Sequence, residues 1–332
     1  MRAPARACAW VALLSLSACE RMPARGNGGP VGPRAIAERV PDAGRPDAAA
    51  LIDPGPATVA EGQSFPFMVA LDERNVYWNT GDAHLRRAAK AGGPPQDLSA
   101  EFTITIVPIG DFVVYTTQRA IKRVARDGSR APETLVTLPE DPLDLVTDGS
   151  HLYFTMFDGS MVGRIPLAGG PAEKLLAGER HQTIAVDATD LYVSSYRGGT
   201  IRRLPKAGGT PTTLIKGLRR PLGLALHGDD LFWASEKDGT IVRMPTQGGT
   251  PIELASGQVN QQSMAFSATH VYWATWGGTA GSHALMAVPL TGGTPIAVAL
   301  NLDSPSGLAS DGVSVYIANK GKGRIEKFPL LR

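Results

Sequence analysis

One phrase recurs along the chain and limits the folds that it can adopt. It is clearest in LYVSSYRGGTIRRLPKAGGTPTTLI (191–215) and returns as LFWASEKDGTIVRMPTQGGTPIEL (231–254). Each copy contains an aliphatic–aromatic pair, then a segment that alternates apolar and basic residues, then a glycine pair. Alternation with a period of two indicates β-strands, and adjacent glycines allow the positive φ angles of tight hairpin turns. The repeat therefore predicts an all-β fold.

The aliphatic–aromatic marker occurs seven times, at Tyr77, Tyr115, Tyr153, Tyr192, Phe232, Tyr272 and Tyr316. The successive intervals are 38, 38, 39, 40, 40 and 44 residues. Repeats of roughly 40 residues with four strand signals each are typical of a β-propeller, in which every repeat forms a four-stranded blade. We therefore expect a seven-bladed β-propeller whose blades contain strands a to d.

The ends of the repeat array predict how the ring closes. The seventh copy stops after its third strand signal, at 324–329, whereas 57–61 precedes the first copy and resembles a fourth strand. Segment 57–71 aligns with 252–266, and both contain a Gly-Gln pair, at Gly62-Gln63 and Gly257-Gln258. We expect residues 57–61 to complete blade seven, because this pairing leaves no open edge. A six-bladed ring with a spare copy is the alternative.

The first residues predict export. Arg2 and Arg6 precede a short apolar stretch, which is too short to span a bilayer as a helix. Leu16-Ser17-Ala18-Cys19 then resembles the bacterial lipobox, in which the cysteine becomes acylated. Cys8 lies inside the signal, so the mature chain keeps one cysteine and cannot form an internal disulfide. We expect 1–18 to be a lipoprotein signal peptide and Cys19 to be the lipidation site; an ordinary cleaved signal is the alternative.

Residues 19–56 predict a flexible tether. They are rich in Pro, Gly, Ala and Arg and contain no aromatic residue. Such a composition cannot bury enough apolar surface to offset chain entropy. The remaining residues, 57–332, are assigned to the propeller. We expect an exported protein that is lipid-anchored to the bacterial cell envelope, with the outer membrane favoured over the inner. An irregular cap packed on the propeller is the alternative reading of 19–56.

Two short patterns support a family resemblance. Aromatic pairs occur at Tyr77-Trp78, Phe232-Trp233 and Tyr272-Trp273, and the motif Gly-x-Ile-x-Arg occurs at 199–203 and 239–243. With these patterns, residues 57–332 resemble the YWTD-type propellers of the low-density-lipoprotein-receptor class. They are similar too to bacterial NHL-like and virginiamycin-lyase-like propellers. The complete Tyr-Trp-Thr-Asp tetrad is absent from the chain. The resemblance implies the fold and carries no function over.

Ligands of propellers usually lie over the central channel, on the face made by the d–a and b–c connections. In this chain that face combines both charge signs with large aromatic side chains. Exposed aromatic and arginine residues are the types that anchor protein contacts, although the aromatic ones can instead pack between blades. The ligand-binding candidates are Phe157, Arg180, His181, Tyr196, Arg219, Arg220, Glu236, Trp276 and Lys320.

Catalytic chemistry has weaker support. The six histidines fall on both faces in this parse, so we expect no metal site, and no cofactor motif is present. Without residues 1–18 the chain has 31 basic and 31 acidic residues, which removes the charge argument for nucleic acid binding. His181 and Glu140 are the weak catalytic candidates for an envelope lyase or lactonase. We expect a lipid-anchored scaffold that binds an envelope or extracellular protein or ligand, with that enzyme as the alternative and a structural spacer as a third possibility.

Overall fold

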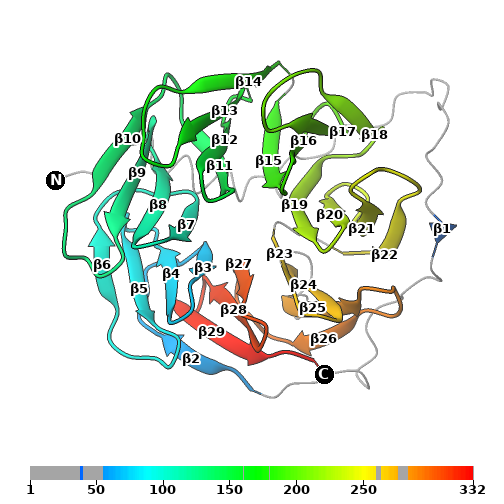
Figure 1. The fold of residues 1–332 in the computed structure, drawn as a ribbon. Coiled ribbons are helices and arrows are strands. Elements are labelled where there is room, and N and C mark those ends of the chain that lie inside the picture. Colours follow the sequence, from blue (N-terminus) through cyan, green and yellow to red (C-terminus); the bar gives the residue numbers. More distant parts are fainter. Residues whose placement is uncertain are drawn as a thin grey trace, which may run out of the picture. The chain divides into compact units, whose positions relative to one another are not determined.

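The computed structural model describes residues 38–39, 55–159, 161–178, 180–258, 263–275 and 283–331. Every regular element among them is a β-strand, and the strands form seven antiparallel sheets arranged in a ring. In Figure 1 strand a of each blade lies nearest the axis of the ring, and the a strands of adjacent blades contact one another around it. The expected seven-bladed propeller is confirmed.

The strands follow one another in the order a, b, c, d within blades 1 to 6. Blade 1 consists of β3 (Val69–Leu71), β4 (Asn75–Asn79), β5 (Leu85–Ala89) and β6 (Gln96–Ser99). Blade 2 consists of β7 (Ile106–Ile109), β8 (Phe112–Thr117), β9 (Ala120–Ala125) and β10 (Glu133–Thr137). Blade 3 consists of β11 (Pro142–Thr147), β12 (His151–Met156), β13 (Met161–Pro166) and β14 (Glu173–Ala177). Blade 4 consists of β15 (His181–Val186), β16 (Asp190–Ser195), β17 (Thr200–Pro205) and β18 (Thr212–Lys216). Blade 5 consists of β19 (Pro221–His227), β20 (Asp230–Ser235), β21 (Thr240–Pro245) and β22 (Ile252–Ala255). Blade 6 consists of β23 (Met264–Phe266), β24 (His270–Thr275), β25 (Ala284–Pro289) and β26 (Ile296–Ala299).

Blade 7 joins the two ends of the propeller. It contains β27 (Pro305–Ser310), β28 (Ser314–Asn319), β29 (Arg324–Pro329) and β2 (Ala57–Ala60). Strand β2 pairs antiparallel with β29, with Ala57 opposite Lys327 and Ala60 opposite Ile325. The expected closure is confirmed and the six-bladed alternative is wrong, because the outer edge of β29 needs a partner that only the N-terminal strand supplies.

Residues before the propeller enter the described structure at one place. A two-residue strand, β1 (Glu38–Arg39), pairs in parallel with β22 at the outer edge of blade 5. The predicted signal peptide 1–18, Cys19, and residues 20–37 and 40–54 of the predicted tether lie outside the described residues. Within the described residues there is no helix that is long and apolar enough to cross a membrane.

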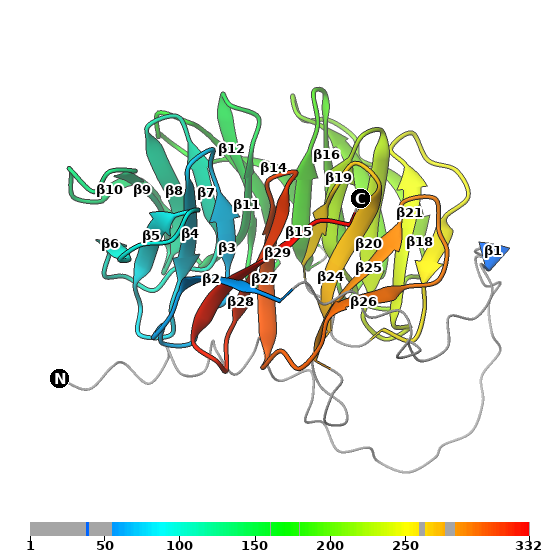
Figure 2. The same cartoon turned by 90° about the horizontal axis from the view of Figure 1, so that it is seen from below.

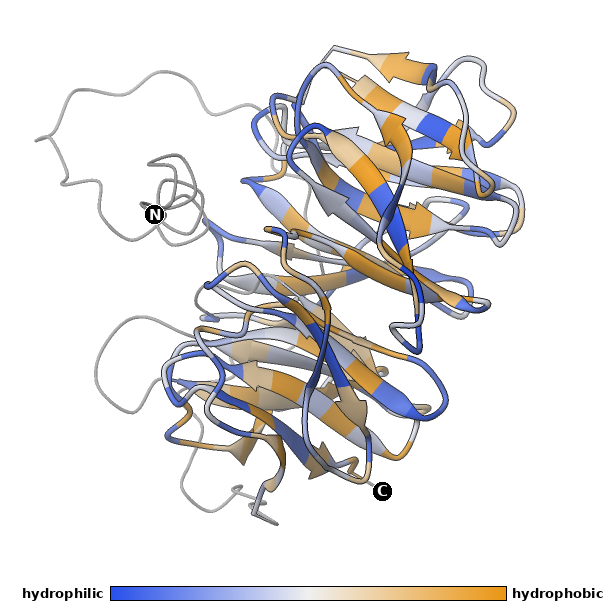
Figure 3. Cartoon of the chain, turned by 90° about the vertical axis from the view of Figure 1, so that its left-hand side faces the viewer, coloured by the Kyte–Doolittle hydropathy of each residue, from blue (hydrophilic) through white to orange (hydrophobic). Residues whose placement is uncertain are grey.

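The marker aromatics form the core between neighbouring blades. Tyr77, Tyr192, Tyr272 and Trp233 are fully buried. Tyr192 of blade 4, for example, belongs to the same apolar cluster as Trp233 of blade 5. Burying each large apolar side chain contributes about 1.5–3 kcal/mol. Figure 3 shows the resulting pattern, with hydrophobic residues in the strands and hydrophilic ones in most connections.

Successive connections alternate between the two ends of each antiparallel sheet, because the strands of a blade run from one face of the ring to the other (Figure 2). We call the face formed by the a–b and c–d turns the bottom face. The face formed by the b–c and d–a connections is the top face.

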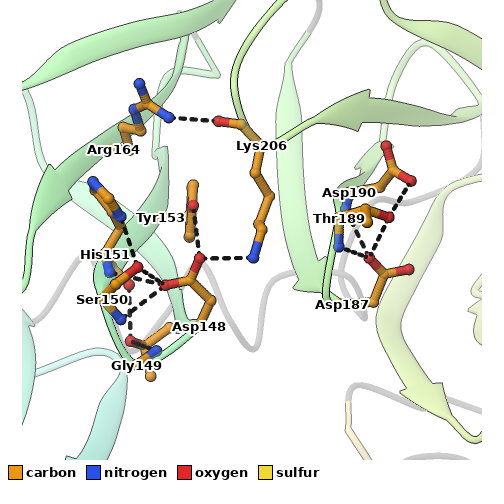
Figure 4. Close-up of polar contacts among 11 residues, drawn as sticks. Asp148, Gly149, Ser150, His151, Tyr153, Arg164, Asp187, Thr189, Asp190 and Lys206 are labelled. Atoms are coloured by element: carbon orange, nitrogen blue, oxygen red, sulfur yellow. Dashed lines mark hydrogen bonds and ion pairs between the residues drawn. The ribbon is translucent and has the colours of Figure 1, made fainter.

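On the bottom face, an aspartate in the a–b turn accepts a hydrogen bond from the marker tyrosine five residues later. The O···O distances are 2.5 Å for Asp72 and Tyr77, 3.0 Å for Asp148 and Tyr153, 2.8 Å for Asp187 and Tyr192, and 3.0 Å for Asp311 and Tyr316. Asp148 also accepts hydrogen bonds from the backbone of Ser150 and His151, as Figure 4 shows. Each aspartate therefore fixes its turn and anchors the core tyrosine.

A cation from the next blade completes three of these pairs. Lys206 lies 2.8 Å from Asp148, Arg126 lies 3.2 Å from Asp72, and Lys90 lies 3.0 Å from Asp311. Burial opposes ionisation of Asp148, but hydrogen bonds from Lys206 and the turn outweigh it and lower the pKa of that carboxyl. Where a blade has Gly110, His227 or Ser267 in place of the aspartate, the next blade has Leu167, Leu290 or Leu330 in place of the cation. The bottom face is thus accounted for by contacts that join the blades.

Candidate functional site

The top face carries unusual backbone conformations. Six described residues other than glycine have a positive φ, between 46° and 65°. All six lie in top-face connections: Phe65, Ala83, Arg119, Arg220, Asn301 and Ser304. The left-handed region costs a side-chain-bearing residue on the order of 1 kcal/mol, so such residues persist where the tertiary structure holds them, often at functional sites. Bottom-face turns reach the same region with glycine, as at Gly208-Gly209.

A cluster of three candidate residues lies on the top face of blades 4 and 5. The Tyr196 hydroxyl donates a hydrogen bond to Glu236 Oε2 at 2.5 Å. Arg220 donates to Glu236 Oε1 at 3.2 Å, and its guanidinium lies 5.2 Å from the centre of the Tyr196 ring. The Glu236 side chain is only 8% exposed. A buried carboxylate with two donors is held in one position, so we call this the Tyr–Arg–Glu cluster.

The repeat explains why these residues meet. Tyr196 and Glu236 are equivalent residues, because each is the first residue after strand b of its blade, β16 in blade 4 and β20 in the neighbouring blade 5. Arg220 ends the d–a connection between those blades, and its left-handed backbone (φ 59°) precedes Pro221. On the exposed side, Arg219 forms an ion pair with Asp238 at 3.1 Å.

The cluster changes the acidity of its members. Burial, together with the hydrogen bond to Glu236 and the charge of Glu236, raises the pKa of Tyr196 to about 12. Burial opposes the charge of Arg220, but the interactions with Tyr196 and Glu236 outweigh it and raise the pKa of the guanidinium. Tyr196 therefore keeps its proton at neutral pH and acts as a hydrogen-bond donor rather than as a base.

Among the described residues, two large aromatic side chains of the top face are exposed. Phe157 is 41% exposed, and its backbone N–H donates to the Asp141 carbonyl at 2.8 Å. Phe65, which the sequence reasoning missed, is 58% exposed. Its position in the d–a connection 61–68, on the face where propeller ligands usually lie, is the signal that could have identified it.

The other candidates lie in different surroundings. His181 is the first residue of β15 and is 2% exposed, so it is a core residue at the edge of the top face. Glu140 and Arg180 are exposed. Lys320 is half-buried, and burial lowers the pKa of its ammonium group. Trp276 lies outside the described residues.

The part of the chain that the structure describes contains no candidate metal site. No group of three or more His, Cys, Asp or Glu side chains there could hold a metal ion. The Tyr–Arg–Glu cluster has one carboxylate and no second ligand of that kind, so its chemistry is hydrogen bonding and charge recognition.

Comparisons with known proteins place the chain in the broad class of β-propellers. No protein-family model matches it, and no curated protein matches its sequence. Virginiamycin B lyase from Staphylococcus aureus is similar in structure, with a TM-score of 0.71 and 17% identity over 83% of this chain and 99% of that one. A streptogramin B lyase gives 0.69 and 14%, over 82% and 96%. The propeller domain of Cps50 (Swd1) from Myceliophteria thermophila gives 0.65 and 13%, over 83% and 99%. At these identities the likeness shows the fold alone.

Proposed function

We propose that this protein is a binding scaffold of the bacterial cell envelope, anchored by lipid on Cys19, and that its top face binds another protein. One observation carries the proposal. The top face gathers both exposed aromatics, the Tyr–Arg–Glu cluster and all six left-handed residues described above. The bottom face, by contrast, uses its charged residues to join blades.

The side chains suit protein recognition. Exposed Phe157 and Phe65 offer apolar area, and Arg220 offers a charged group that is already oriented by Glu236. Interfaces gain most of their affinity from a few aromatic and arginine residues that need little ordering on binding. The lipobox and the composition of 19–56 support the envelope location, since a tether lets a propeller reach partners away from the membrane.

The test compares matched variants of the lipidated full chain as baits on membranes. Phe65→Ala and Phe157→Ala remove exposed top-face aromatics, and Val313→Ala removes the exposed bottom-face residue, which is 74% exposed. We expect a cross-linked partner that is recovered with the wild type and with Val313→Ala and is lost or strongly reduced with the top-face variants. Equal recovery with all three variants would contradict the proposal. For the anchor, Cys19→Ala should release the protein from membranes.

A lyase or lactonase is the second candidate function, and the structural likeness to virginiamycin B lyase favours it. The purified protein would be assayed on a panel of cyclic lactones, including a streptogramin B. Under this alternative, ring opening is expected and should fall in His181→Ala or Glu140→Ala but persist in Asp229→Ala, a bottom-face control. Absence of turnover by the folded wild type would exclude it.

A further inference from the structure

Charge on the top face is divided between two parts of the ring. In the top-face connections that belong to or lead into blades 1 to 3, six residues are acidic and one is basic, a net charge of −5. The acidic residues are Glu61, Asp82, Glu101, Glu140, Asp141 and Asp158, and the basic residue is Arg119.

The connections of blades 4 to 7 have the opposite sign. Their described residues include seven basic and three acidic ones, a net charge of +4. The basic residues are Arg180, Arg197, Arg219, Arg220, Lys237, Lys320 and Lys322, and the acidic ones are Glu236, Asp238 and Asp303. The bottom-face turns show no such division: blades 1 to 3 have a net charge of −1 there, and blades 4 to 7 have −2.

Ion pairs within the chain satisfy part of this charge. In the acidic part, Glu61, Asp82 and Glu101 pair with Arg324, Arg86 and Lys122 of neighbouring strands. At the boundary between blades 3 and 4 the situation differs. Glu140 on one side and Arg180 and Arg197 on the other are exposed. None of these three forms an ion pair with a described residue.

The geometry of a seven-membered ring adds a constraint. A two-fold axis that lies in the top face and passes between blades 3 and 4 must also pass through blade 7. Rotation about it exchanges blade 3 with 4, blade 2 with 5, and blade 1 with 6. If a second copy is placed face to face by this rotation, the acidic blades 1 to 3 of each copy lie over blades 4 to 6 of the other, whose described top-face connections have a net charge of +3, and blade 7 faces blade 7. The Glu140 region of one copy then faces the Arg180 and Arg197 region of its partner.

Two exposed phenylalanines and a half-buried tyrosine lie along the same axis. Exposed Phe157 on blade 3 and half-buried Tyr196 on blade 4 flank it at one end. Exposed Phe65, in the connection from blade 7 to blade 1, lies near the other end. The third large apolar residue that is exposed among the described residues, Val313, is on the bottom face. An apolar line bordered by complementary charge is the arrangement expected for a protein interface.

We propose that the top face binds a second copy of this chain, in a face-to-face dimer about this two-fold axis. The proposal rests on the proposed function, that the top face binds protein, and names the partner. A foreign partner would need an acidic and a basic region at matching positions, whereas a second copy has them by symmetry. In such an isologous interface each contact occurs twice.

The test is sedimentation velocity of the full chain in detergent, over a range of protein concentrations. A dimer is expected at about 0.1 M salt. It should weaken at about 1 M salt, because the screening length falls from about 10 Å to about 3 Å. Glu140→Arg and Arg197→Glu should each raise the dimer dissociation constant about tenfold, since each substitution disturbs two symmetric contacts.

The decisive variant combines both changes. Glu140→Arg with Arg197→Glu exchanges the charges across the boundary and should restore the dissociation constant to within about threefold of wild type. Asp229→Arg, an exposed bottom-face substitution, is the matched control and should change nothing. A chain that sediments as a monomer at all protein concentrations and at both salt concentrations would refute the dimer. A double variant whose dimer dissociation constant is higher than that of either single variant would refute it as well. If the chain is monomeric yet top-face variants still lose a different partner on membranes, the proposed function stands without the dimer; if capture is also unaffected, both fail.

Discussion

Replacing Asp144 by threonine should stabilise the propeller at neutral pH and not at acid pH. Asp144 lies in β11, the innermost strand of blade 3, and joins two blades. Its Oδ2 accepts a hydrogen bond from the backbone N–H of Ile184 in blade 4 at 3.0 Å, and its Oδ1 accepts one from Leu145. Among the described inter-blade contacts, this is the place where a charged group bridges two innermost strands.

Other blades make the same contact with a hydroxyl. Thr183 accepts from the backbone N–H of Leu224 at 3.3 Å, and Ser263 accepts from that of Leu308 at 3.2 Å. A threonine at position 144 should therefore keep the bridge to Ile184 while removing the buried charge.

The magnitude follows from the acidity of the group. Burial raises the pKa of Asp144 from 3.8 to about 6, against the opposing hydrogen bonds from Ile184 and Leu145. Ionisation of Asp144 thus costs the folded state about 3 kcal/mol relative to the unfolded chain, an upper value because the residue is only half-buried. The pKa of Asp144 is higher in the folded state than in the unfolded chain, so the protonated carboxyl favours the folded state. This stabilisation is complete below about pH 4 and is lost as the pH rises through about 6. Threonine forgoes the hydrogen bond from Leu145, worth about 1 kcal/mol, so we expect a net gain of about 1–2 kcal/mol at about pH 7.5.

The assay is urea unfolding followed by tryptophan fluorescence, at about pH 4 and about pH 7.5. Asp144→Thr should exceed wild type at the higher pH and equal it or fall below it at the lower. Thr183→Asp is the reverse control and should destabilise blade 4 most at the higher pH. A difference between Asp144→Thr and wild type that does not change with pH would refute the reasoning.

Four further outcomes are expected. Leu218→Gln should raise the free energy of unfolding in urea by about 1 kcal/mol. Gln63 and Gln258 each accept the indole N–H of the tryptophan fifteen residues later, Trp78 and Trp273. Position 218 is fifteen residues before Trp233, whose Nε1 is buried without an acceptor among the described residues. Lys206→Met should lower the free energy of unfolding by about 1–3 kcal/mol, because it leaves Asp148 without its cation in the bottom face. Thr246→Lys offers Asp187 a cation and should not destabilise the protein in the same assay. Glu236→Gln should lower the pKa of Tyr196 from about 12 toward its ordinary value in an ultraviolet titration; an unchanged pKa would argue against the hydrogen bond. Deletion of 57–61 should lower the unfolding midpoint and broaden the transition, since β29 loses its partner, and an unchanged transition would contradict closure by β2.

The number of blades, the strand order and the closure could be predicted from the amino-acid sequence alone. These depend on short-range properties: alternation of apolar residues, glycine where φ must be positive, and a fixed interval between aromatics. The shared Gly-Gln pairs illustrate this, because the same local pattern has the same role in both places, at Gln63 and Gln258. The sequence also nominated Tyr196, Arg220 and Glu236 separately, as residues of top-face connections.

Which of these residues contact one another depends on the tertiary structure. Tyr196 and Glu236 are 40 residues apart, and their contact depends on two neighbouring blades presenting the same repeat position side by side. Arg220 reaches them through a left-handed backbone that no local pattern selects, since residues other than glycine enter that region only where surrounding contacts hold them. For the same reason the sequence alone did not predict that His181 is buried in the core or that Phe65 is exposed. A period in the sequence fixes the strands and turns, but the partners of a side chain depend on its radial position and on the blade beside it.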